Sequence, residues 1–248
     1  MCMARTYNKP PLIEAVCDFR FSSSQPWDWT IPGLFYEQIR DRFPIKEQLN
    51  TIETVVDPDQ GRFVQQAQPK LQFASETRSE VIQIGPNNLS IHQLPPYDGW
   101  AHFKKRILEY LQTYSNAANS SGLSNIALRY INHIELPYAD VELEDYFRVM
   151  PQIPQPIPQI FPAFLLNVDI PYESPVSGLR IIFGTVVPKK LGDFAYVLDL
   201  NMYSTNDSVP TNEHVSDWLE IAHERIEVAF DASFTERAHY ELFREVGK

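Results

Sequence analysis

Two segments of this chain alternate apolar and polar residues, and this period of two constrains the fold more than any other feature. One segment covers residues 12–21 and the other covers residues 128–136. Successive side chains of a β-strand point to opposite faces, so each segment is predicted to be a strand with one buried face. The chain is therefore expected to contain a sheet whose second face is polar and available to solvent or to a ligand.

Residue patterns of this kind predict the other elements of the chain. Strands are expected at 62–74, 80–94, 123–136, 164–170, 179–187 and 194–203, with a hairpin turn at 85–88. Apolar stripes at helical spacing predict long helices at 100–115 and 212–230, and Pro32 opens a short helix that Pro44 ends. Ser233 and Glu236 form a capping-box pattern, which predicts a last helix that starts at Ser233.

These elements predict an α+β fold. We expect about eight mostly antiparallel strands that form either one extended sheet or two related sheets, with the long helices packed on the apolar face. Residues 151–162 are rich in proline, which excludes a helix there and favours a polyproline II or sheet-edge path. We interpret them as a stiff connector between an N-terminal half, 1–150, and a C-terminal half, 163–248, that pack as one structural unit. The alternative is that the connector is a ligand for an aromatic groove.

Composition limits the environment and the partners. The formal net charge is −11, which argues against binding to nucleic acid, and the only basic cluster, Lys104 to Arg106, is expected to be a solvated helix face. No apolar run is long enough to cross a bilayer, and the first residues lack the apolar stretch of a signal peptide. Two cysteines, Cys2 and Cys17, are too few for a disulfide framework. We therefore expect a cytoplasmic protein with no membrane partner.

No standard catalytic or cofactor motif is present in the sequence. The nine glycines are scattered, so no glycine-rich phosphate loop can be assembled. Glu220 with His223, and Glu236 with His239, have the spacing of ligands in carboxylate-bridged di-metal bundles. Such a site also needs glutamates from two further helices, and too few long helices are predicted. We expect neither a metal nor a cofactor.

The polar face of the predicted sheet holds the candidate site residues. Asp199 and Asn201, polar residues of the C-terminal half, are also expected on this polar face. Two interpretations are open: a face that only meets water, or a groove in which Arg129 binds a small anion and Glu14 or His133 transfers a proton. In either case we expect Arg129 to pair with a carboxylate, Glu14 being the best candidate. The candidate residues are Glu14, Asp18, Arg20, Arg129, His133 and Glu135.

Three further residues are expected to be structural. Asn132 has the parity of the apolar residues around it, so we expect it to be buried and to bind a neighbouring backbone. Trp100 and Phe103 follow a turn and begin the helix at 100–115, where aromatic side chains are expected to anchor its first turn to the core.

Several of these segments resemble a sporadically distributed family of prokaryotic proteins that are about as long as this chain and have no established function. The resemblance lies in residues 10–21, 97–103 and 128–132, and in His223, Phe230, Thr235 and Glu236. It implies an accessory protein that is inherited patchily, as mobile or defence-linked genes often are. The family has no assigned catalytic residues, so the resemblance implies none here.

We expect a non-catalytic binding or assembly protein that binds a protein partner or forms a homodimer. The alternative is a hydrolase or nuclease-like enzyme that acts on an anionic substrate at the polar sheet face. Convergence of Glu14, Arg129 and His133 in a concave pocket would favour the enzyme. Their dispersal over an open sheet would favour the binding protein.

Overall fold

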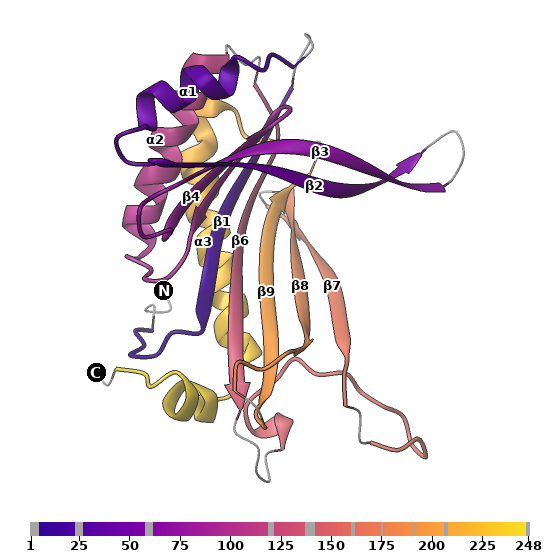
Figure 1. Ribbon diagram of the computed structural model, residues 1–248. Helices are drawn as coiled ribbons and strands as arrows, with labels where there is room; N and C mark the ends of the chain where they lie inside the picture. The colour runs from indigo at the N-terminus through magenta and orange to yellow at the C-terminus, as the bar shows by residue number, and fades with distance from the viewer. Residues whose placement is uncertain are drawn as a thin grey trace. The chain divides into compact units, whose positions relative to one another are not determined.

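The sheet contains nine strands in the part of the chain that the structure describes. The computed structural model describes residues 5–22, 27–57, 62–118, 122–136, 142–159, 162–174, 176–190, 192–205 and 208–246, with the backbone alone for 51–57 and 62–68. The strands are hydrogen-bonded in the order β2-β3-β4-β5-β1-β6-β9-β8-β7 (Figure 1). The pairs of known register are all antiparallel. The predicted α+β class with an extended antiparallel sheet is confirmed, with nine strands where about eight were expected.

The chain divides into two compact units, which we describe one at a time. The first unit comprises Met1–Ala15, Ala127–Ser208 and Asp217–Lys248, and the second comprises Val16–Ile126 and Val209–Ser216. The strands β1 (Leu12–Phe21) and β6 (Leu123–Leu136) contribute residues to both units. The proline-rich residues 151–162 fall inside the first unit.

The second unit contains four further strands and two helices. The strands are β2 (Ile45–Asp57), β3 (Arg62–Ala74), β4 (Glu80–Gly85) and β5 (Asn88–Gln93), and the helices are α1 (Ile31–Ile39) and α2 (Trp100–Ala118). Aromatic side chains fill its core: the ring of Tyr114 on α2 stacks on that of Phe21 at 4.5 Å between centroids. Phe103 is fully buried, and the half-buried ring of Trp100 contacts it.

Two features of the second unit differ from the sequence-based expectation. The strand β2 was not predicted, because lysine, glutamate, glutamine and asparagine interrupt its apolar pattern; such residues are common on strands at the edge of a sheet, where β2 lies. Arg106 is buried and is not part of a solvated face. Its guanidinium donates to the side chain of Gln93 and lies 3.5 Å from Glu80 Oε1, so the charge is compensated inside the unit.

The first unit contains the other end of the sheet and the C-terminal helices. Its elements are the 3-10 turn Leu143–Asp145, β7 (Leu165–Glu173), β8 (Val176–Val186), β9 (Phe194–Ser204), most of α3 (Val215–Ser233) and the π-helical turn Ala238–Leu242. A 3-10 turn at Asn212–His214 precedes α3. The apolar face of β6 meets α3, where the hydroxyl of Tyr130 is 3.0 Å from His223 Nδ1.

The capping box predicted at Ser233 does not form. Helix α3 continues to Ser233, whose hydroxyl donates to the carbonyl of Ala229 at 2.7 Å, four residues earlier in the helix. The carboxylate of Glu236 instead accepts a hydrogen bond of 2.8 Å from Arg5. The salt bridge with Arg5 gives this carboxylate a stronger partner than a backbone amide.

Candidate functional site

The polar sheet face of the first unit carries a row of side chains that crosses four strands. Arg129 on β6 stands opposite Asn201 on β9, which stands opposite Arg180 on β8, which stands opposite Asp169 on β7. Residues directly opposite one another on a sheet share a face and lie close enough to interact. The register therefore assembles a charged row from segments far apart in the sequence.

Arg129 pairs with the carboxylate of Asp199, and its expected pairing with Glu14 stays a prediction. Its Nε donates to Asp199 Oδ1 at 2.8 Å, and its Nη2 donates to Oδ2. Asp199 lies two residues from Asn201 on the same face, so the long guanidinium reaches it diagonally and forms a bidentate pair. The Asp199 side chain is 7% exposed and that of Arg129 is 40% exposed. Glu14 is half-buried on β1.

A second charge pair on this row is fixed by an aromatic ring. Arg180 Nε donates to Asp169 Oδ1 at 3.0 Å, and the hydroxyl of Tyr203 donates to the same oxygen at 3.0 Å. The ring of Tyr203 occupies the space over Gly178, where a Cβ would lie 2.3 Å from Tyr203 Cζ. The hydrogen bonds from Arg180, together with the one from Tyr203, hold the pKa of Asp169 below its ordinary value. The charges of Arg180 and Asp169 therefore compensate each other.

His133 and Glu135 form a separate pair. His133 Nε2 is 3.1 Å from Glu135 Oε1, which also accepts a hydrogen bond of 2.8 Å from the backbone amide of Lys189. The Lys189 amide, and secondarily His133, lower the pKa of Glu135. Arg129 and His133 are four residues apart on one strand, a separation of about 13 Å at about 3.3 Å per residue. These two candidate residues therefore do not converge on one reacting group.

The remaining sequence candidates have local contacts. In the second unit, Asp18 accepts a hydrogen bond from the hydroxyl of Ser90, and Arg20 is exposed. In the first unit, Asn132 is buried, and its Nδ2 donates to the carbonyl of Leu198, its opposite residue on β9, at 3.2 Å. This is the contact with a neighbouring backbone that its parity predicted.

The sequence did not reveal a different surface, the outer edge of β7. Among the described strands β7 is the last of the sheet, so no described strand neighbours its outer edge (Figure 1). The amide of Thr185 donates to the carbonyl of Phe164, and the register continues without a bulge. In an antiparallel pair such bonded positions alternate. The even-numbered residues of β7 therefore bond to β8, and the odd-numbered residues direct their backbone groups outward.

Apolar side chains lie exposed along this edge. Leu165 is 75% exposed, Val168 is 39% exposed and Ile170 is 37% exposed. Ile170 stands opposite the buried Leu179, so Val168 and Ile170 extend the apolar face of the sheet beyond the part that is covered. The alternation of 164–170 predicted the strand, but only the position of the strand in the sheet shows that its apolar residues are exposed.

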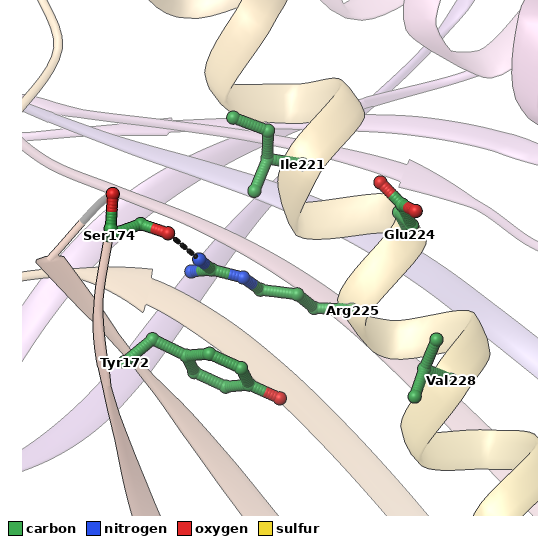
Figure 2. Close-up of a pocket in the computed structure, with 6 residues that line it drawn as sticks. All are labelled: Tyr172, Ser174, Ile221, Glu224, Arg225 and Val228. Carbon is green, nitrogen blue, oxygen red and sulfur yellow. Dashed lines mark hydrogen bonds between the residues drawn. The ribbon is translucent and has the colours of Figure 1, made fainter. Parts of the chain in front are cut away.

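A hollow of about 380 Å³ adjoins the end of β7 (Figure 2). The guanidinium of Arg225 lies over the ring of Tyr172 at 4.1 Å and donates to the carbonyl of Ser174 at 2.6 Å and to the hydroxyl of Ser177 at 2.5 Å. Burial lowers the pKa of Arg225, and the two hydrogen bonds go to neutral oxygens. The hollow is lined by Tyr172 of β7, by Ser174 just after the end of β7, and by Ile221, Glu224, Arg225 and Val228 of α3.

The described residues hold neither a metal-binding cluster nor a membrane-spanning helix. Within the described ranges, no group of three or more histidine, cysteine, aspartate or glutamate side chains could hold a metal ion. No helix in the same ranges is long and apolar enough to cross a membrane. No protein-family model matches the chain, and the search of curated proteins found no match. The family resemblance seen in the sequence stays a prediction.

Proposed function

We propose that this chain is a non-catalytic binding or assembly protein that recognises a protein partner through the outer edge of β7. The observation that carries the proposal is the combination of exposed apolar side chains and outward-directed backbone groups on one strand. An extended segment of a partner can add to such an edge, with backbone hydrogen bonds for affinity and side-chain contacts for specificity. Exposed apolar edges also promote uncontrolled aggregation, so we expect a specific partner to cover this edge.

The enzyme alternative has less support. A site that binds an anionic substrate needs positive charge that is available to the substrate, together with a convergent acid or base. Arg129 is already held bidentately by Asp199, and Arg180 is held by Asp169. The separation between Arg129 and His133 along β6 supports dispersal over an open face. A small anion on this face would have to displace a carboxylate.

The proposed setting of the protein follows from the sequence. The lack of a disulfide framework favours the cytoplasm. The family resemblance favours an accessory prokaryotic protein linked to mobile or defence genes. In such a setting, the proteins that it helps to assemble would be encoded by neighbouring genes.

Affinity purification from the native host, with a matched pair of variants, tests the proposal. Val168→Lys places a charge on the edge, and Val187→Lys makes the same change at a position that is 87% exposed beyond the end of β8. We expect the wild-type chain and Val187→Lys to retain a stoichiometric partner and Val168→Lys to lose it. Equal retention by both variants, or a wild-type chain that retains no protein, would refute the β7 edge as the binding site.

A further inference from the structure

We infer that the strand bound at the β7 edge is β7 of a second copy of this chain, paired antiparallel across a two-fold axis at Asn167. The inference rests on the proposed function and specifies its partner. Closed two-fold dimers are the commonest symmetric assemblies, and a two-fold interface must be complementary to itself. The sequence of β7 meets that requirement in one register.

The register at Asn167 uses the outward-directed backbone groups of β7. Leu165 would stand opposite Asp169 of the partner subunit, and Asn167 opposite Asn167 of the partner subunit. These odd-numbered residues direct their amides and carbonyls away from β8. Each such pair exchanges two hydrogen bonds in an antiparallel ladder, so the dimer would gain about six bonds.

Neighbouring registers are less favourable. An axis at Asp169 would bring two carboxylates directly opposite each other, which is destabilising. An axis at Val168 would place Pro171 opposite Leu165 in the ladder, and proline has no amide hydrogen to donate. An axis before Asn167 would extend the ladder beyond Leu165, where β7 begins. The axis at Asn167 uses the amides of Leu165, Asn167 and Asp169 and leaves Pro171 outside the ladder.

The same register pairs the exposed apolar side chains of Val168 and Ile170 with apolar side chains of the second copy. On the apolar face, Val168 would stand opposite Leu166 of the partner subunit, and Ile170 would stand opposite Phe164 of the partner subunit. These even-numbered residues would form the close, non-hydrogen-bonded pairs, with Cα atoms about 4.5 Å apart. Val168 and Ile170 are each more than a third exposed in the single chain, so pairing would remove apolar area from water.

The net charge of the chain predicts how dimerisation responds to salt. Two copies that each carry a formal charge of −11 repel each other over a distance that salt shortens. The contact is made of backbone hydrogen bonds, with apolar side chains on one face and with Leu165, Asn167 and Asp169 on the other. Asp169 is paired with Arg180 of its own chain, so no salt bridge would cross the interface. Dimerisation should therefore strengthen as sodium chloride is raised, whereas an interface built on salt bridges would weaken.

Cysteine cross-linking tests the register. In a Cys2→Ser background, Asn167→Cys should give a covalent dimer on mild oxidation, because the Cα atoms of a bonded pair lie about 5.5 Å apart, within disulfide range. Leu165→Cys is the matched control: the two copies of residue 165 would be about 13 Å apart along the strands, too far for a disulfide. Cys17 is buried with a raised pKa and should stay unreactive. Absence of the residue-167 dimer, or equal cross-linking at both positions, would overturn the register.

Sedimentation velocity separates this inference from the proposed function. The wild-type chain should be dimeric and should shift further toward dimer in high salt. Asn167→Pro removes the amide at the axis, at the same parity as the natural Pro171, and should be monomeric. A wild-type chain that is monomeric at all concentrations, yet retains a cellular partner that Val168→Lys loses, would refute the second copy and leave the proposed function intact. Dimerisation that Asn167→Pro does not affect would also refute it.

Discussion

The pair formed by Arg129 and Asp199 allows a quantitative prediction about the stability of the first unit. Asp199 is almost fully buried, whereas Arg129 is 40% exposed. Removing the guanidinium by Arg129→Ala leaves a buried carboxylate without its bidentate partner. Exposed pairs contribute up to about 1 kcal/mol, and breaking a buried pair costs about 3–5 kcal/mol. For this half-exposed pair we expect Arg129→Ala to lower the free energy of unfolding by about 2 kcal/mol.

The opposite truncation should cost less. Asp199→Ala leaves Arg129, whose exposed guanidinium can be hydrated, so we expect a loss of about 1 kcal/mol. The double variant removes both charges and should be less destabilised than the sum of the two single variants by about 1 kcal/mol.

Urea denaturation followed by circular dichroism measures these differences, with unchanged denaturant slopes as the control for a two-state comparison. Asp169→Ala combined with Arg129→Ala provides the matched comparison and should show the smaller coupling, because Asp169 lies three strands away from Arg129. A coupling energy of zero for Arg129 and Asp199, or a larger loss for Asp199→Ala than for Arg129→Ala, would refute the reasoning.

Three further predictions concern single positions of the first unit. Gly178→Ala should lower the free energy of unfolding by about 1–3 kcal/mol in urea titrations, because its Cβ would overlap Tyr203, and adding Tyr203→Ala should restore part of the loss. Asn132→Ala should cost about 1–3 kcal/mol in the same assay, since it leaves the carbonyl of Leu198 without its side-chain donor; a neutral result would contradict the clamp. Burial lowers the pKa of His239 below 6.5, so the unfolded chain binds a proton first and the melting temperature should fall as pH decreases through and below about 6.5; His239→Gln should flatten that dependence.

The sequence by itself determined the local elements of this protein. The strands β1, β3 and β6 begin and end where alternation predicted, because the period of two is a property of the extended backbone and needs no distant partner. The long helices were predicted from apolar stripes at helical spacing, which is also a local property of the chain, and their ends differ from the prediction by a few residues. The burial of Asn132 also followed from parity alone. The polar strand β2 escaped prediction because it lacks the apolar alternation on which the reading depends.

Only the tertiary structure decided which residues meet and which stay exposed. Arg129 and Asp199 are 70 residues apart, and their contact depends on the pairing of β6 with β9, a non-local register that no local pattern contains. The position of β7 at the end of the sheet likewise depends on the order of all the strands. The same alternation that buries residues in a central strand therefore exposes Val168 and Ile170 on β7, because burial depends on the neighbours that a strand has and not only on its own sequence.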